Sequence, residues 1–348
     1  MKTRISKRIL SLLLTLCLLL CSFAPSVLTV NAATAVKVEY MGDYVCADFS
    51  NSRLFVLKGT KLYLNNTDYS GGYELYDYAQ VAPDSTLTFL DAMIVGDKIY
   101  SLYKDSEKSY LNILNTSSLK NFTNTLNFDC SKLMAFENGD VLVSLVNGGG
   151  DFVFYLYNYD STNSYQSYKF FKLNEKIYDF YGATGNKVYY RTANGLKYAE
   201  LSESAFTQNT KIINNVNNSA YNRVNPLEFS DSNLAAVNTG DVYSVSDDST
   251  FTKKLSFNRN AYTQSSGSLT AFVSNSKLVI GADGSDKLSA YDSSTFEYVS
   301  SVNTAYLPYM LCTNGSSVLC VEKNGNDYYL EIFEVSDFIK IDAERKLQ

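Results

Sequence analysis

Apolar residues follow short polar turns at a near-constant interval along most of the chain. Seven times between residues 51 and 318, a turn of small polar residues leads directly into an apolar segment. The apolar residues that close these turns are Leu54, Ile99, Leu142, Val188, Leu234, Leu278 and Val318. Their spacings are 45, 43, 46, 46, 44 and 40 residues. This regularity indicates seven copies of one supersecondary unit.

Within one repeat, the pattern predicts four short strands. Residues 268–303 show the unit most clearly, with strands expected at 268–273, 278–281, 288–291 and 296–302. The strands are rich in β-branched and aromatic residues. The Gly, Asn, Asp and Ser residues between them tolerate positive φ or bond their own backbone. Seven such repeats of about 40–46 residues predict an all-β, seven-bladed β-propeller with four-stranded antiparallel blades.

The passage from the third to the fourth strand carries a family resemblance. The sequence A-Y-D-S-S-T-F-E-Y-V at 290–299 resembles YVTN-type and related WD-like propellers, and degenerate copies lie at 114–119, 159–162 and 245–250. The resemblance covers residues 36–342 and concerns the repeat pattern alone, since the chain has no Trp and so lacks the Trp-Asp dipeptide of WD repeats. It implies the fold but no particular activity, because propellers host unrelated functions.

A propeller must also close its ring. Val36–Tyr40 forms an isolated strand pattern ahead of the first repeat, and Phe338–Ile341 forms another at the far end. Either could complete the last blade and remove its exposed edge. We expect the N-terminal strand to do so.

The N-terminus has the pattern of a secretory signal peptide. Four basic residues within the first eight precede an apolar segment at 9–23, and small-residue cleavage signals end at Ala32 and Ala35. A membrane anchor needs about 20 apolar residues, more than this segment offers. We therefore expect residues 1–32 to be removed, with cleavage after Ala32 or Ala35, and residues 33–348 to form a single propeller domain. The composition resembles that of secreted, extracellular proteins of Gram-positive bacteria.

Charge and composition restrict the chemistry. The net charge is −6 and becomes −10 once the four basic residues of the signal peptide are removed. An acidic protein is a poor partner for nucleic acid or anionic membranes, so neither is expected. The chain has no His, which excludes Ser-His-Asp and Cys-His catalysis and imidazole metal sites. No cofactor or metal is expected, although calcium at a loop stays open.

Cysteines offer one possible crosslink. Cys312 and Cys320 flank the last repeated turn and could face each other across a hairpin. The preferred interpretation is that they are buried thiols, which behave as small apolar side chains. Sequence leaves the disulfide open.

Carboxylates are the remaining candidates for catalysis. Asp91, Asp179 and Glu228 lie in predicted first strands, which line the central channel of a propeller. Two carboxylates at a suitable separation can hydrolyse glycosides. The preferred interpretation is that they are simply solvated in the channel.

Tyrosine is the most unusual feature of the composition, at 29 Tyr against 20 Phe. Most tyrosines fall within strands and are expected to pack between blades. Six lie where strands begin, on the face opposite the repeated turns: Tyr44, Tyr178, Tyr221, Tyr262, Tyr306 and Tyr309. Tyrosine gives stiff contact area with a polar tip and is enriched at binding hot spots. These six are the candidate binding residues, with ordinary packing as the alternative.

The sequence thus favours a secreted, non-catalytic binding or scaffold propeller. Its expected partner is a glycan, a peptide or a cell-envelope protein, recognised through the loop faces. A carboxylate-dependent carbohydrate hydrolase or lyase and a structural cell-envelope component are the alternatives.

Overall fold

The computed structural model describes residues 36–38, 46–50, 53–65, 72–81, 86–145, 152–160, 164–209, 213, 227–229, 233–237, 240–247, 250–259, 268–313, 315–336 and 338. The chain divides into two compact units, Met1–Ala32 and Ala33–Gln348. The first unit lies outside the described residues, so the signal peptide stays a prediction. Within the described part, no helix has the length and apolar character needed to cross a bilayer.

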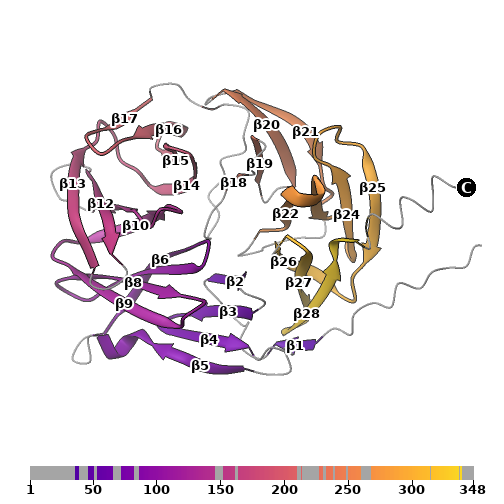
Figure 1. Ribbon diagram of the computed structural model, residues 1–348, viewed down its shortest axis with the longest axis horizontal. Coiled ribbons are helices and arrows are strands. Elements are labelled where there is room, and N and C mark those ends of the chain that lie inside the picture. The colour runs from indigo at the N-terminus through magenta and orange to yellow at the C-terminus, as the bar shows by residue number, and fades with distance from the viewer. Residues whose placement is uncertain are drawn as a thin grey trace, which may run out of the picture. The chain divides into compact units, whose positions relative to one another are not determined.

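Residues 33–348 form seven four-stranded antiparallel sheets arranged in a ring, which confirms the predicted seven-bladed propeller (Figure 1). Blade one contains β2 (Cys46–Ser50), β3 (Arg53–Lys58), β4 (Lys61–Asn65) and β5 (Gly72–Asp77). Blade two contains β6 (Thr88–Val95), β7 (Lys98–Lys104), β8 (Ser109–Asn115) and β9 (Lys120–Leu126). Blade three contains β10 (Cys130–Ala135), β11 (Val141–Leu145), β12 (Phe152–Asp160) and β13 (Ser164–Lys172). Blade four contains β14 (Asp179–Thr184), β15 (Lys187–Thr192), β16 (Gly195–Leu201) and β17 (Phe206–Gln208).

The last three blades follow the same order. Blade five contains β18 (Leu227–Phe229), β19 (Leu234–Val237), β20 (Asp241–Asp247) and β21 (Thr250–Ser256). Blade six contains β22 (Thr270–Val273), β23 (Leu278–Ala282), β24 (Lys287–Asp292) and β25 (Tyr298–Asn303). Blade seven contains β26 (Leu307–Thr313), β27 (Ser317–Asn324), β28 (Asp327–Glu334) and β1 (Val36–Val38). Two short 3-10 helices, Tyr78–Val81 and Ser274–Ser276, complete the described elements.

The N-terminal strand closes the ring. β1 pairs antiparallel with β28, with Val36 opposite Leu330, and is the outer strand of blade seven. The expected closure is confirmed. The rival segment begins at Phe338, which is fully buried and accepts a hydrogen bond from the Ser300 hydroxyl of blade six at 2.8 Å. Residues 339–341 of that segment lie outside the described residues.

Each of the seven predicted turns connects the first and second strands of its blade. Six of them contain a described residue with positive φ: Gly96, Gly139, Gly185, Asn233, Lys277 and Gly315. Glycine and asparagine adopt this conformation most readily, which explains the composition of the turns. The seven repeated apolar residues are all buried, with at most 4% of the side chain exposed. The turn thus starts a strand whose first residues enter the core.

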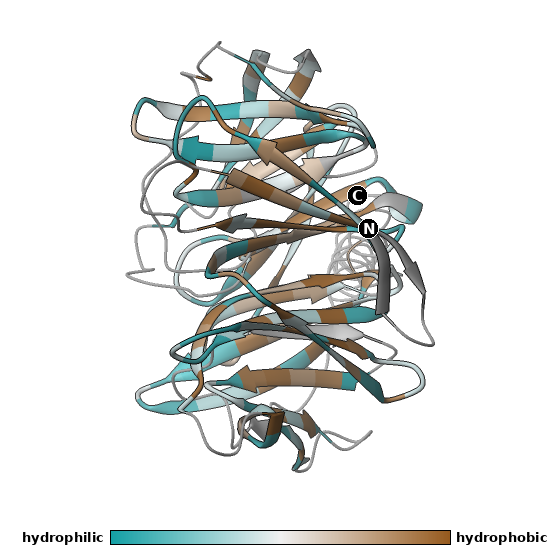
Figure 2. Cartoon of the chain, turned by 90° about the vertical axis from the view of Figure 1, so that its left-hand side faces the viewer, coloured by the Kyte–Doolittle hydropathy of each residue, from teal (hydrophilic) through white to brown (hydrophobic). Residues whose placement is uncertain are grey.

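The core lies between neighbouring blades and not in the channel. One cluster joins blades two, three and four, and another joins blades six and seven. The strands carry most of the apolar residues, and polar residues are frequent at the connections (Figure 2). Since each blade buries both faces against its neighbours, blades one to seven depend on one another for their cores.

The structure excludes a bridge between Cys312 and Cys320. In the β26–β27 ladder, Cys312 lies opposite Leu319 while Cys320 lies opposite Leu311. Successive side chains of a strand point to opposite faces. The two thiols therefore lie on opposite faces of blade seven, and no disulfide joins them.

Candidate functional site

The first strands of neighbouring blades lie side by side around the centre of the ring. Contacts run from β2 through β6, β10 and β14 to β18, and from β22 through β26 back to β2. Asp91 lies on β6, Asp179 begins β14 and Glu228 lies on β18, so all three candidate carboxylates occupy first strands as predicted. The side chain of Glu228 lies outside the described residues, as do Tyr44, Tyr221 and Tyr262.

The structure brings two of these carboxylates into one network. We call it the inner cluster; it consists of Asp91, Lys132, Tyr178, Asp179 and Arg191. These residues come from the inner strands of blades two, three and four and from β15. Sequence reasoning found Asp91, Asp179 and Tyr178 but missed the two cations.

β-Bulges set the direction of side chains in this region. The ladder between the first and second strands shifts register between Phe89 and Asp91 in blade two, and between Cys130 and Lys132 in blade three. A bulge bends its strand and re-aims a side chain. Asp91 and Lys132 both follow the bulge directly, so they occupy equivalent positions in adjacent blades.

Cations from two blades hold the Asp179 carboxylate. Lys132 Nζ lies 3.3 Å from Oδ1, while Arg191 donates from Nη2 to Oδ2 at 2.6 Å and from Nε at 3.2 Å. All three side chains are partly buried. Charge-assisted bonds of this kind are shorter and stronger than neutral ones. They link the first strands of blades three and four and leave both oxygens of Asp179 engaged.

Asp91 has a different environment. Its Oδ2 accepts the Leu133 N–H of the next blade at 2.9 Å, and its Oδ1 accepts the Ala92 N–H at 3.1 Å. Burial raises the pKa of Asp91 to about 6 and the nearby charge of Asp179 adds to the rise, whereas Lys132 and the two N–H groups oppose it. Asp91 therefore connects blade two to blade three through the backbone and titrates closer to neutrality than an ordinary aspartate.

Tyr178 is the exposed member of the inner cluster. It directly precedes β14, its N–H donates to the Arg191 carbonyl at 2.9 Å, and 42% of it is exposed. The Arg191 guanidinium lies 5.2 Å from the ring centroid, and Lys176 Nζ lies 5.6 Å from it. Cations at these distances are attracted to the face of the ring. Tyr178 is thus a surface aromatic ring in contact with two cations.

Tyr306 and Tyr309 lie elsewhere, in blade seven. The Tyr306 ring packs on Tyr329 with centroids 4.6 Å apart. Tyr309 packs edge-on against Tyr328 at 5.1 Å, with Lys323 Nζ 5.4 Å from its centroid. Both are partly buried. Among the described tyrosines that were proposed for binding, Tyr178 is therefore the most exposed, and these two have packing partners.

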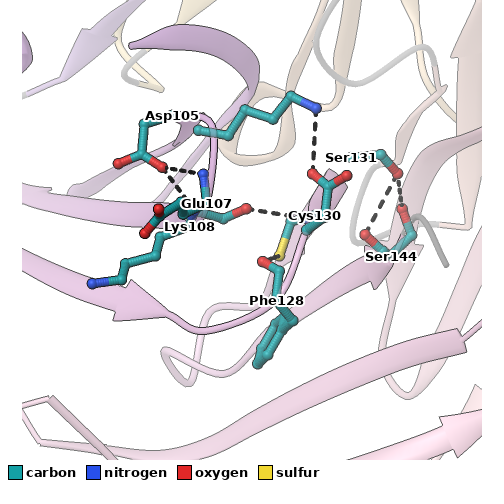
Figure 3. Close-up of polar contacts among 10 residues, drawn as sticks. Asp105, Glu107, Lys108, Phe128, Cys130, Ser131 and Ser144 are labelled. Carbon is teal, nitrogen blue, oxygen red and sulfur yellow. Dashed lines mark hydrogen bonds and ion pairs between the residues drawn. The ribbon is translucent and has the colours of Figure 1, made fainter. Parts of the chain in front are cut away.

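Hydrogen bonds position the strand that carries Lys132. The Cys130 N–H donates to the Ser109 hydroxyl of blade two at 3.0 Å, and the Ser131 and Ser144 hydroxyls lie 2.7 Å apart within blade three (Figure 3). Burial raises the pKa of the Cys130 thiol to about 12, so this cysteine stays neutral. The start of β10 is fixed on both sides, which makes the inner cluster rigid.

The repeat spacing gave no signal for Lys132. Shifting Asp91 by the interval of 43 residues between its repeat and the next leads to Met134, because the β-bulges displace Lys132 from the repeat spacing. Arg191 had no signal either, because its contact depends on the register of β15 against β14. No group of three His, Cys, Asp or Glu residues that could hold a metal occurs in the described part of the chain.

Comparisons with known proteins give the fold alone. No protein-family model matches the chain, and no curated protein is found to match it. The chain is similar to the crystal structure of the β-propeller domain of Cps50 (Swd1) from Myceliophteria thermophila, with a TM-score of 0.52 at 10% identity, covering 86% of this chain and 98% of that one. It is also similar to a chain of the Mitotic Checkpoint Complex, with a TM-score of 0.51 at 13% identity, covering 87% and 90%. At these identities the likeness supports the WD40-like propeller fold and carries no function by itself.

Proposed function

We propose that the chain is an exported, non-catalytic propeller that binds a peptide or protein through the face at which its first strands begin. The observation that carries the proposal is the exposed Tyr178 ring, which lies directly before β14 in contact with Arg191 and Lys176. Rigid aromatic residues with neighbouring arginine dominate the energetics of protein interfaces. The signal-peptide pattern of residues 1–32 supports export.

The charges around Tyr178 favour a partner that presents an anionic or aromatic group. The inner cluster and Lys176 contribute three cations and two carboxylates, while the whole chain has a net charge of −6. A locally cationic site on an acidic protein orients an anionic group toward itself and disfavours other approaches. A partner segment with an acidic residue beside an aromatic one fits this arrangement.

Replacing Tyr178 by alanine tests the proposal. A thermal-shift screen of residues 33–348 against acidic-aromatic peptides, peptidoglycan fragments and glycans identifies a probe, since a ligand at 100 times its Kd adds about 2.7 kcal/mol of stability. We expect a peptide to be the hit. Tyr178→Ala should then weaken its binding roughly tenfold or more, as for a hot-spot tyrosine. The melting temperature should change little, because 42% of Tyr178 is exposed and alanine keeps the backbone hydrogen bond to the Arg191 carbonyl.

Tyr168 provides the matched control. It lies on β13, the outer strand of blade three, and 66% of it is exposed. Tyr168→Ala should leave peptide affinity unchanged. Equal losses for both variants, or a screen in which only glycans bind, would contradict the proposed peptide site at Tyr178.

A hydrolase is the second candidate, on the strength of one observation. Asp91, with its raised pKa, lies in the same network as Asp179, which two cations surround. Catalytic acid–base pairs are commonly built from two carboxyl groups that lie in different environments. The binding function is favoured because all four carboxyl oxygens already have partners. Each oxygen of Asp91 accepts a backbone N–H, and each oxygen of Asp179 forms an ion pair.

Asp91→Asn separates the two candidates. Because the folded pKa is about 6 and the ordinary value is 3.8, wild-type stability should fall as pH rises from about 4 to about 6 and this contribution should then level off. Asparagine does not titrate, so the variant should lose that part of the pH dependence while keeping peptide affinity. Denaturation at a series of pH values measures this. Glycan turnover by the wild type that disappears in Asp91→Asn would instead establish the hydrolase.

A further inference from the structure

A second pair of carboxyl groups is buried inside blade seven, away from the inner cluster. Glu322 lies on β27 and Glu331 on β28, where Glu322 is opposite Tyr329 and Glu331 is opposite Cys320. These registers place both glutamates on one face of the sheet, at diagonal positions within reach of each other. Glu322 is 0% exposed and Glu331 is 1% exposed.

The outer oxygens of the pair hold the connection between blades six and seven. The Tyr306 N–H donates to Glu322 Oε2 at 2.8 Å, and the Ala305 N–H donates to Glu331 Oε2 at 3.2 Å. The Thr304 hydroxyl donates to the Tyr306 carbonyl at 2.7 Å within the same connection. Ala305 is exposed and Tyr306 is partly buried. A surface segment is thus tied directly to two buried carboxyl groups.

The inner oxygens of the pair, Glu322 Oε1 and Glu331 Oε1, are fully buried and have no hydrogen-bond partner among the described residues. Besides the effect of burial, Glu331 lies close enough to Glu322 to raise its pKa, whereas the nearby Cys320 thiol lowers it. A carboxyl oxygen buried without a donor is costly, and a proton held by the pair would satisfy these two oxygens.

No lysine or arginine of the described residues forms an ion pair with Glu322 or Glu331. Lys323, next to Glu322 in the sequence, lies over the rings of Tyr309 and Tyr328. The titratable groups nearby are Cys320 from β27, Cys312 from β26 and Tyr329 from β28. Blade six packs against blade seven through an apolar cluster that contains Cys320 and includes Ala271, Val273, Ile280 and Ala290.

Burial therefore opposes a second negative charge here. Burial, together with the neighbouring Glu331, raises the pKa of Glu322 to about 9, while the Tyr306 N–H and the Cys320 thiol oppose the rise. Burial also raises the pKa of the Cys320 thiol well above its usual value. At neutral pH Glu322 is therefore protonated in the folded protein and carries the proton of the pair.

We propose that Glu322 and Glu331 form a proton-binding site, in which one proton shared between their Oε1 atoms fastens the 304–306 connection to blade seven. Folding takes up this proton and unfolding returns it to solvent, so the site couples the stability of the last blade to pH. Loss of the proton places two charges on the pair and loosens the connection that positions Tyr306. This proposal is independent of the peptide-binding role of Tyr178.

The pH dependence of stability tests the site. The folded pKa lies above the unfolded one, so stability falls as pH rises from about 4.5 to about 9. One extra proton in the folded state makes the unfolding constant rise tenfold per pH unit. Between pH 6 and pH 8 we expect Glu322 to contribute a rise of about 100-fold for residues 33–348, while the end of the Asp91 titration adds about twofold. Urea denaturation at each pH measures it.

Glu322→Gln removes the titration while keeping the contact, because its amide N–H can donate to Glu331 Oε1. The variant should show an unfolding constant that rises only about twofold between pH 6 and pH 8, through Asp91 alone, and should be more stable than the wild type at pH 8. Glu334→Gln, at an exposed position of β28, is the matched control and should retain the wild-type dependence of the unfolding constant on pH. Glu331→Gln carries the same expectation as Glu322→Gln if the latter does not fold.

Two further measurements distinguish a bound proton from another ligand at the Glu322–Glu331 pair. Infrared difference spectra of the wild type at pH 8 should contain the carbonyl stretch of a protonated carboxyl, absent from Glu322→Gln. Added Ca²⁺ or K⁺ should leave the wild-type stability at pH 8 unchanged. Three results would overturn the proton site. They are a wild-type unfolding constant that does not change between pH 6 and pH 8, a Glu322→Gln variant that keeps the wild-type pH dependence, and stabilisation of the wild type by Ca²⁺ or K⁺ that Glu322→Gln abolishes.

Discussion

Deleting residues 33–38 is expected to lower the free energy of unfolding by roughly 3 kcal/mol, because it opens the ring at blade seven. β1 pairs three residues with β28, from Val36 opposite Leu330 to Val38 opposite Tyr328. The loss corresponds to the lost ladder hydrogen bonds at about 1 kcal/mol each. The deletion also leaves β28 as an exposed edge, which can pair with a second chain. Chemical denaturation and size-exclusion chromatography measure the two effects.

Adding the missing strand as a synthetic peptide of residues 33–42 is the control. A free strand can add to an exposed sheet edge through backbone hydrogen bonds. We expect the peptide to restore the stability of the truncated protein and to suppress its self-association. A truncated chain that stays monomeric and as stable as the full domain would show that β1 is dispensable for closure.

The features that sequence predicted well are local ones. Each repeated turn combines residues that accept positive φ with an apolar residue that enters the core, as Gly96 and Ile99 do in blade two. Both requirements act within four residues, so they leave a visible pattern. The period then gave the number of blades, and the apolar segment Val36–Tyr40 left over at the start suggested the closing strand. Strand ends in residues 268–303 agree with the prediction within two residues.

The features that sequence missed depend on register between strands far apart in the chain. Arg191 reaches Asp179 because β15 folds back on β14, and Lys132 reaches it from another blade. Glu322 and Glu331 look like ordinary polar positions, and only the β27–β28 register and the packing of blade six show that both are buried. The disulfide alternative was decided in the same way, by Cys312 and Cys320 facing opposite sides of blade seven. Local patterns cannot encode these contacts.

Both buried polar networks lie where neighbouring blades meet. The inner cluster connects blades two, three and four, and the glutamate pair ties the connection from blade six to blade seven. Apolar packing between blades is non-directional, so it positions one strand against the next less specifically than a hydrogen bond does. Buried hydrogen bonds to specific N–H groups fix that position, because leaving them unmade costs the full desolvation of each group. The two networks therefore set the relative positions of first strands, on which the candidate binding face depends.

Replacing Leu142 by alanine is expected to destabilise the domain by roughly 3 to 4 kcal/mol. Leu142 is fully buried on β11, opposite Met134 and Tyr155, in the cluster shared by blades two to four. Removing a buried leucine costs the lost burial of its side chain and the cavity that remains. The melting temperature of a domain this large should fall by about 2 °C or more for each kcal/mol. Calorimetry measures both quantities.

Leu145 on the same strand is the matched control. It is only partly buried at the margin of the same cluster, so Leu145→Ala should cost about 1 kcal/mol, as expected when little cavity forms. The position of Leu142 is occupied by a buried apolar residue in all seven blades. Leu54→Ala and Leu234→Ala should therefore lower the free energy of unfolding about as much as Leu142→Ala. If Leu142→Ala costs no more than Leu145→Ala, the repeated position does not carry the core. The period that identifies the blades would then reflect turn geometry alone.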